Sequence, residues 1–208
     1  MASFYADVSC KLRPHFKAHK TPEIAKRQLA AGSVTGITCA TPDEADVASA
    51  FCDDILIANQ VIGRDKVRLV AEIAKRGVDI KIAVDSIEGV EEIAAAAADG
   101  GVEIGVIVDV NVGMPRCGVQ PGEPAAALAR RISDTSGIRL RGAMGYEGHA
   151  VGLPEREKRD AVARKAMDRL TASVDAIRAA GLPCDIVSAG GTGTFDSTGR
   201  TPGITEVQ

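Results

Sequence analysis

The side chains best suited to chemistry lie in one short run, Arg13-Pro14-His15-Phe16-Lys17-Ala18-His19-Lys20. These eight residues hold five basic or imidazole side chains and two of the chain's three histidines. Successive side chains of a β-strand point to opposite faces, so as a strand the run places four of them on one face: Arg13, His15, Lys17 and His19. Stacked cations repel one another unless an anion lies among them. The run therefore predicts a site for a phosphate or carboxylate, with one lysine available as a nucleophile.

A solvated basic edge strand is the alternative interpretation of such a run. Its opposite face, however, is apolar and carries the large aromatic side chain of Phe16, which indicates a strand covered on one side. The third histidine also falls at a predicted strand end, in Gly145-Tyr146-Glu147-Gly148-His149. These two features favour a functional site.

The composition is typical of a soluble globular protein, with 45% apolar and 25% charged residues among 208. A net charge of −3 argues against nucleic acid or an anionic membrane as a partner. The five cysteines are scattered without a C-x-x-C pair, which favours reduced thiols and no structural zinc. No apolar run reaches the roughly 20 residues that span a bilayer, and no signal peptide is evident. We expect a cytoplasmic protein.

Short apolar runs alternate with helical patterns along the chain. Eight strands are predicted, at residues 11–17, 34–40, 54–59, 79–85, 103–110, 139–146, 184–189 and 204–208. Six helices are predicted between them, at residues 21–31, 42–51, 65–75, 88–98, 123–133 and 155–180. Continuously apolar strands such as Ile104-Gly105-Val106-Ile107-Val108 are typical of strands that are buried on both faces.

Eight strands separated by helices predict an α/β fold of the (β/α)8 or TIM-barrel type. An open doubly wound sheet is the alternative, but chemistry-bearing residues follow many of the strands instead of one switch point. No internal linker is evident, so residues 1–208 are predicted to form one domain. Both ends look cut: residues 1–9 resemble the tail of a helix, and residues 204–208 an eighth strand without its helix.

A glycine-rich loop follows the seventh predicted strand, in Ser188-Ala189-Gly190-Gly191-Thr192-Gly193-Thr194. The active site of a (β/α)8 barrel lies at the carboxyl ends of the strands, and phosphate commonly binds after strands seven and eight. Glycines such as Gly190, Gly191 and Gly193 let backbone N–H groups converge on phosphate oxygens. Ser188 and Thr192 can add hydroxyl donors. The loop therefore predicts a phosphate site.

Further candidates follow the fifth and sixth predicted strands. Arg116, in Asn111-Val112-Gly113-Met114-Pro115-Arg116-Cys117-Gly118, offers a planar fork of donors to an anionic oxygen. Tyr146 can stack or donate a hydrogen bond, and His149 can act as an acid or base near neutral pH. Asp85 and Asp109 also end predicted strands, and we expect their carboxylates to pair with the cations of the 13–20 run.

A lysine among anion binders, a phosphate loop across the barrel and an arginine for a third anionic point together suggest pyridoxal 5′-phosphate. The lysine would join the cofactor's aldehyde, the loop would hold its phosphate, and the arginine would face its phenolic oxygen. His15 lies beside the lysine in the sequence, and we expect it to contact the cofactor too.

The chain resembles the fold-type III pyridoxal-phosphate enzymes, specifically the family of D-threonine aldolase and eukaryotic-type D-serine dehydratase. The resemblance covers essentially the whole chain and rests on four runs quoted in full or in part above, at residues 13–20, 113–118, 145–149 and 188–194. It implies an alanine racemase-like barrel in which Lys17 carries the cofactor. It further implies that Arg116 faces the phenolic oxygen and that residues 190–193 hold the phosphate.

The resemblance implies a lyase acting on β-hydroxy D-amino acids, which it cleaves to glycine and an aldehyde. In that reaction Lys17, Tyr146 and His149 are expected to be catalytic, with His149 as a candidate base for the β-hydroxyl proton. Dehydration of D-serine or 3-hydroxyaspartate is the alternative, because the barrel motifs suit both routes. A non-catalytic pyridoxal-phosphate carrier and a barrel that binds another phosphorylated metabolite are further alternatives.

The resemblance also implies features that lie outside these residues. Members of the family hold a divalent metal, such as manganese or zinc, in a C-terminal β-domain, and no histidine of this chain matches those ligands. The chain is therefore expected to be truncated, to lack that domain and to contain no metal ligand of its own. A homodimer is expected by the same resemblance.

Overall fold

The computed structural model describes all 208 residues of the chain. At its centre is an eight-stranded parallel sheet with the order β1-β8-β7-β6-β5-β4-β3-β2. The strands are β1 (Lys11–Leu12), β2 (Ile37–Cys39), β3 (Asp54–Ile57), β4 (Asp79–Val84), β5 (Ile104–Asp109), β6 (Ile138–Gly145), β7 (Ile186–Ala189) and β8 (Glu206–Val207). This sequential order is that of a (β/α)8 barrel and differs from a doubly wound sheet, whose order reverses at a switch point.

The two ends of the curled sheet approach each other between β1 and β2. Isolated parallel bridges join Leu12 to Val34 and His15 to Thr38. The Leu12 N–H donates to the Ser33 carbonyl oxygen at 2.8 Å, and the Thr38 N–H donates to the Pro14 carbonyl oxygen at 2.9 Å. The sheet is therefore consistent with the predicted (β/α)8 barrel.

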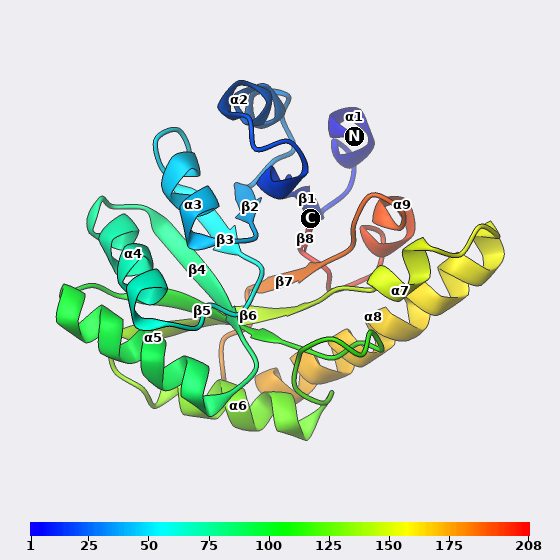
Figure 1. Ribbon diagram of the computed structural model, residues 1–208. Coiled ribbons are helices and arrows are strands. Elements are labelled where there is room, and N and C mark those ends of the chain that lie inside the picture. The colour runs from blue at the N-terminus through cyan, green and yellow to red at the C-terminus, as the bar shows by residue number, and fades with distance from the viewer.

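Helices lie around the outside of the curled sheet (Figure 1). They are α1 (Ala2–Tyr5), α2 (Pro22–Ala30), α3 (Pro42–Ala48), α4 (Arg64–Lys75), α5 (Ile87–Gly100), α6 (Glu123–Ser133), α7 (Gly148–Val151), α8 (Arg156–Ala179) and α9 (Phe195–Thr198), with a 3-10 turn η1 (Phe16–Ala18). The six predicted helices are confirmed as α2–α6 and α8, with ends that differ by up to three residues. None of the helices combines the length and apolar character that a bilayer crossing requires.

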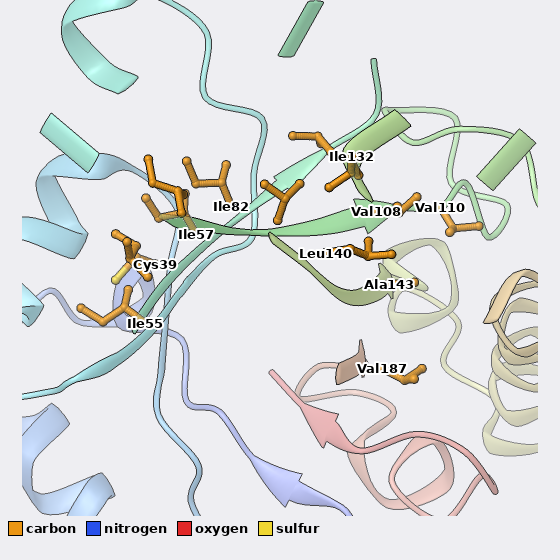
Figure 2. Packing of buried hydrophobic residues seen from close by; sticks show 14 of the residues in the cluster. Cys39, Ile55, Ile57, Ile82, Val108, Val110, Ile132, Leu140, Ala143 and Val187 are labelled. Atoms are coloured by element: carbon orange, nitrogen blue, oxygen red, sulfur yellow. The ribbon is translucent and has the colours of Figure 1, made fainter. Parts of the chain in front are cut away.

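Outward-facing strand residues form the main core, between the sheet and the helices. The 47-residue cluster includes Ile55, Ile57, Ile82 and Val108 (Figure 2). The residues between them on these strands point to the inner face of the sheet, because successive side chains alternate between the two faces. The strands are therefore apolar on the face that packs against the helices.

The inward face of the sheet carries two different layers. Near the carboxyl ends of the strands, a separate apolar cluster contains Leu56, Ala83, Ile107 and Met144. Closer to the amino ends, the inward side chains are mainly charged. These charged residues are Arg13, Asp54, Asp79, Lys81, Arg141 and Glu206. We call them the ionic layer.

The predicted strand over residues 11–17 is wrong beyond its first two residues. β1 ends at Leu12, and residues 16–18 form the 3-10 turn η1. Pro14 has no N–H to continue a ladder, and the His15 imidazole accepts the Lys17 N–H at 3.4 Å, which caps the turn. Arg13 and Lys17 therefore do not share a face: Arg13 points into the barrel and is 1% exposed, whereas Lys17 is exposed.

Candidate active site

A cavity of about 260 Å³ opens at the carboxyl ends of the strands. Its lining combines residues from at least five segments that are far apart in the sequence: His15, Lys17, Ala18, Ala40, Ala58, Asn59, Arg116, Met144, Tyr146, Gly190, Gly191, Thr192 and Gln208. The structure therefore brings seven of the sequence-predicted site residues together, as is expected for a (β/α)8 barrel. Those seven are His15, Lys17, Arg116, Tyr146, Gly190, Gly191 and Thr192.

The 3-10 turn places Lys17 at the rim of this cavity. Because η1 begins directly after the strand-like residues that bridge to β2, the Lys17 side chain leaves the sheet at its carboxyl end. His15 lies beneath the turn. Its burial, with a smaller contribution from the Lys17 charge, lowers the pKa of His15 from 6.5 to about 3, so its ring is neutral at physiological pH.

The cations of the cavity have no carboxylate partner. Neither Lys17 nor Arg116 forms an ion pair within 4.0 Å, and no aspartate or glutamate lines the cavity. The Arg116 guanidinium lies 6.0 Å from the centre of the Tyr146 ring. Burial, helped by the Glu147 charge, raises the pKa of Tyr146, so its hydroxyl stays protonated. The cavity thus carries uncompensated positive charge and suits an anionic ligand.

The loop that follows β7 lines the same cavity through Gly190, Gly191 and Thr192. The N–H groups of Gly191, Thr192 and Gly193 donate to no acceptor within the protein. Gly190 has φ +75°, and a Cβ there would lie 2.8 Å from a Val207 methyl carbon, so glycine is required. Consecutive unpaired N–H groups form a concave donor site for anions. The loop is therefore suited to the phosphate predicted from its sequence.

Three predicted site residues lie outside the cavity lining. Ser188 is fully buried in β7, and its hydroxyl oxygen accepts a hydrogen bond from the Gln208 side chain at 2.8 Å. Gly193 lies in the loop after β7, and a Cβ on it would lie 2.9 Å from a Val151 methyl carbon. His149 is exposed on α7, where its ring lies close to Gly113. The roles of these three residues stay predictions.

The expected pairing of Asp85 and Asp109 with the cations of the 13–20 run is wrong. Asp109 accepts hydrogen bonds from Gln60 at 2.8 Å and from Cys117 at 3.3 Å, and Asp85 accepts from the Gly118 N–H at 2.9 Å. Burial raises the pKa of Asp109. Both carboxylates therefore fix the segment that carries Arg116, instead of neutralising the lysine.

Arg13 has other partners than those expected. Its Nη1 atom lies 2.6 Å from Asp54 Oδ1, and its Nε atom lies 2.8 Å from Glu206 Oε1. Burial alone would lower the pKa of Arg13, but the charges and hydrogen bonds of Glu206 and Asp54 outweigh it, and the pKa is raised. Arg13 therefore belongs to the ionic layer and not to the cavity.

Sequence reasoning assigned no role to Glu147 or Gln208. Glu147 is fully buried and accepts hydrogen bonds from the loop after β7, and Gln208 lines the cavity. The acidic residue between Tyr146 and Gly148 was a local signal that could have pointed to Glu147. No local pattern pointed to Gln208, because its cavity position depends on β8 lying beside β7.

A larger hollow of about 600 Å³ lies between α4 and α5 on the outside of the molecule. Charged side chains of the two helices make up most of its lining. No glycine-rich loop borders this hollow, and it does not lie at the carboxyl ends of the strands. We therefore place the candidate active site in the smaller cavity.

The chain contains no group of three or more His, Cys, Asp or Glu side chains arranged to hold a metal ion.

Comparison with known proteins shows to which proteins the chain is similar. The chain is 37% identical over 198 residues to a D-threonine aldolase from Arthrobacter sp, an alignment that covers 95% of this chain and 52% of that protein. It is 34% identical over 201 residues to a D-threo-3-hydroxyaspartate dehydratase from Delftia sp. (strain HT23), with coverage of 95% and 52%. The chain thus spans about half the length of these relatives.

A solved structure shows the same similarity in three dimensions. The D-threonine aldolase from Filomicrobium marinum superimposes with a TM-score of 0.96 and 35% identity, covering 100% of this chain and 56% of that one. A family model described as alanine racemase, N-terminal domain, matches residues 2–201. The chain therefore belongs to the alanine racemase N-terminal domain family and is similar to its D-threonine aldolase and 3-hydroxyaspartate dehydratase members.

Proposed function

We propose that this chain is the pyridoxal 5′-phosphate-binding part of a lyase that cleaves β-hydroxy D-amino acids to glycine and an aldehyde. One observation carries the proposal: Lys17 and Arg116, both without carboxylate partners, line one cavity with a loop of unpaired backbone N–H groups. A phosphorylated aldehyde with an anionic ring oxygen would give each of these groups a partner: the aldehyde for Lys17, the ring oxygen for Arg116 and the phosphate for the backbone N–H groups. The names of the relatives support the choice of substrate.

The residues of the cavity fit this cofactor. The N–H groups of residues 191–193 would bind its phosphate, and Arg116 would face its phenolic oxygen. Tyr146 would lie against the same loop, since a Cβ on Gly191 would come within 3.0 Å of its ring. His15 is neutral, so it adds no further positive charge beside the lysine.

When bound, pyridoxal phosphate supplies an aldehyde for the lysine and a ring that withdraws electrons from the substrate. The chain's own residues would hold and move protons around it. Lys17 would supply the amine that substrate displaces, and Tyr146 would keep its proton and orient the substrate by hydrogen bonding. His149 would accept the β-hydroxyl proton, which requires its exposed ring to turn toward the cavity.

Trapping with borohydride tests the cofactor assignment. The 208-residue chain is incubated with pyridoxal phosphate, reduced, digested and mapped by mass spectrometry. We expect the phosphopyridoxyl tag on Lys17 and its loss in Lys17→Ala. Lys20, which lies three residues away and 3.4 Å from Glu44, is the internal control. A tag on Lys20, or no tag at saturating cofactor, contradicts the proposal.

Dehydration is the second candidate reaction, because a relative at 34% identity is named as a dehydratase. Incubation with D-threonine and with D-threo-3-hydroxyaspartate separates the two. Release of glycine with an aldehyde supports the aldolase, and release of a keto acid with ammonia supports the dehydratase.

We further propose that residues 1–208 form one cofactor-binding domain. The homodimer that we propose rests on the resemblance of the motifs, and the proposed cytoplasmic location rests on the scattered, unpaired cysteines. The divalent metal that the resemblance implies would be held by the C-terminal β-domain and not by these residues, which include no group of three or more His, Cys, Asp or Glu side chains arranged for a metal.

A further inference from the structure

Glu147 is a fully buried carboxylate next to the candidate active site. It directly follows Tyr146, at the carboxyl end of β6. One of its oxygens accepts hydrogen bonds from the Thr194 hydroxyl at 2.7 Å and the Thr198 hydroxyl at 2.5 Å. The other accepts the Gly190 N–H at 3.1 Å. All of these donors lie 43 to 51 residues away along the chain.

The contacts of Glu147 span the loop after β7. Gly190 begins the loop and Thr194 ends it, so the carboxylate fixes both ends. Between them lie the three residues whose N–H groups donate to no protein acceptor. Because Gly190 donates to Glu147, its own N–H is turned away from the cavity. The carboxylate thus determines which backbone donors of the loop remain available.

No cation compensates this buried charge. Glu147 forms no ion pair within 4.0 Å, unlike the buried Glu206, which pairs with Arg13. A buried carboxylate is costly unless it is hydrogen-bonded, so its three donors are needed to retain it. An apolar side chain at this position would leave the Gly190 N–H and the two threonine hydroxyls without their acceptor. The arrangement is explained if the loop must be held in one conformation.

We propose that Glu147 is a positioning residue that holds the loop over residues 190–194 ready for a phosphate, without touching the ligand. This inference rests on the proposed function, because it assigns the loop to the phosphate of pyridoxal phosphate. It predicts that Glu147 sets the preference for the phosphorylated cofactor over pyridoxal, which has the same aldehyde and ring but lacks the phosphate.

The test compares dissociation constants of pyridoxal phosphate and pyridoxal, read from the visible absorbance band of the lysine-bound cofactor. In Glu147→Ala we expect the preference for pyridoxal phosphate to fall at least about tenfold, with pyridoxal affinity changed less than about threefold. Glu147→Gln should retain most of the preference. Its amide oxygen can accept the Gly190 N–H, and its amide nitrogen can donate to the threonine hydroxyl oxygens.

A matched control is Ser173→Ala. Ser173 is also fully buried and accepts a backbone N–H, that of Gly122 at 2.9 Å, but it lies in α8 away from the cavity. This variant should keep the wild-type preference. If Glu147→Ala does not fold, the nearly isosteric Thr194→Val removes one contact at the end of the loop and should lower the preference about threefold.

The outcomes separate this inference from the proposed function. Equal loss of affinity for both ligands in Glu147→Ala, or an unchanged preference in a folded Glu147→Ala or Thr194→Val, overturns the positioning role alone. Wild-type protein that acquires no tag on Lys17 overturns the proposed function and this inference with it. A selective loss of affinity for pyridoxal phosphate in Glu147→Ala, with most of that affinity retained in Glu147→Gln, supports both the proposed function and the positioning role.

Discussion

The two ends of the barrel interior differ in whether their positively charged side chains have carboxylate partners. In the ionic layer, near the amino ends of the strands, every buried cation is paired. Arg13 contacts Asp54 and Glu206, and Lys81 lies 2.6 Å from Asp54 and 2.8 Å from Asp79. At the carboxyl ends, the lysine and arginine of the cavity contact no carboxylate at all.

This difference separates charges that are paired inside the fold from charges that remain available to a ligand. A cation that is removed from water is retained only with good partners, and the ionic layer supplies them from β3, β4 and β8. Lys17 and Arg116 need no such partners in the free protein, since the cavity opens to solvent. Their charge is then available to a ligand. The apolar cluster of Leu56, Ala83, Ile107 and Met144 lies between the two ends.

The largest expected effect comes from breaking a pair in the ionic layer. Arg13→Ala leaves the Glu206 carboxylate, itself 3% exposed, without its cation. We expect the free energy of unfolding to fall by about 3–5 kcal/mol, measured by urea denaturation. Lys17→Ala should change it by less than about 0.5 kcal/mol, because this exposed side chain pairs with nothing.

A surface pair provides the control for this comparison. Arg139 lies 3.1 Å from Glu103, and both side chains are more than half exposed. Arg139→Ala should cost no more than about 1 kcal/mol, since solvent screens such pairs. A loss in Lys17→Ala as large as that in Arg13→Ala would show that the two ends of the barrel do not differ as described.

Removing the unpaired arginine of the cavity should weaken ligand binding without destabilising the fold. Arg116→Ala should raise the dissociation constant of pyridoxal phosphate about 10- to 100-fold while the free energy of unfolding stays unchanged. Arg116→Lys should give an intermediate value, because lysine keeps the charge but loses the planar fork. Equilibrium dialysis measures both. Arg64→Ala, an exposed arginine on the outer helix α4, is the matched control.

An unchanged dissociation constant in Arg116→Ala would remove the arginine from the site. A loss of unfolding free energy in the same variant would instead make it a structural residue, which its lack of ion pairs argues against.

The overall fold could be predicted from the sequence because its signals are local. Continuously apolar segments mark strands such as β5, and glycines and capping residues mark the ends of helices. Together these local signals give the alternation of strands and helices. Thr41 illustrates this, because its hydroxyl oxygen accepts the Glu44 N–H at 3.2 Å, and threonine is one of the residues preferred at a helix N-cap. The short helices α7 and α9 were missed because four residues are too few to show a helical period.

The candidate site could be predicted only in part. The sequence runs that carry Lys17, Arg116 and the glycine loop are each recognisable alone. The partner of Arg13 could not be read in the same way, because Glu206 lies 193 residues away. The strand alternation that grouped Arg13 with Lys17 failed where Pro14 and the His15 cap turned the chain. Pairing of distant residues therefore limits what the sequence predicts.

The smallest expected effect concerns His15, at the edge of the cavity. The folded protein keeps this ring neutral down to about pH 3, whereas the unfolded chain takes up a proton below about pH 6.5. Between these values the unfolded state binds more protons, so the free energy of unfolding decreases as the pH falls. Because the ring is partly exposed, we expect His15 to account for a loss of about 1 kcal/mol between pH 7.5 and pH 5.

Urea denaturation of the wild type and of His15→Asn at these two pH values isolates the contribution of this ring, since all other titrating groups are shared. The variant should lose about 1 kcal/mol less than the wild type on acidification. Equal losses would mean that the His15 ring is as easily protonated in the folded protein as in the unfolded chain. The cavity would then gain a third positive charge in mild acid, and the contrast between its charge and that of the ionic layer would grow as the pH falls.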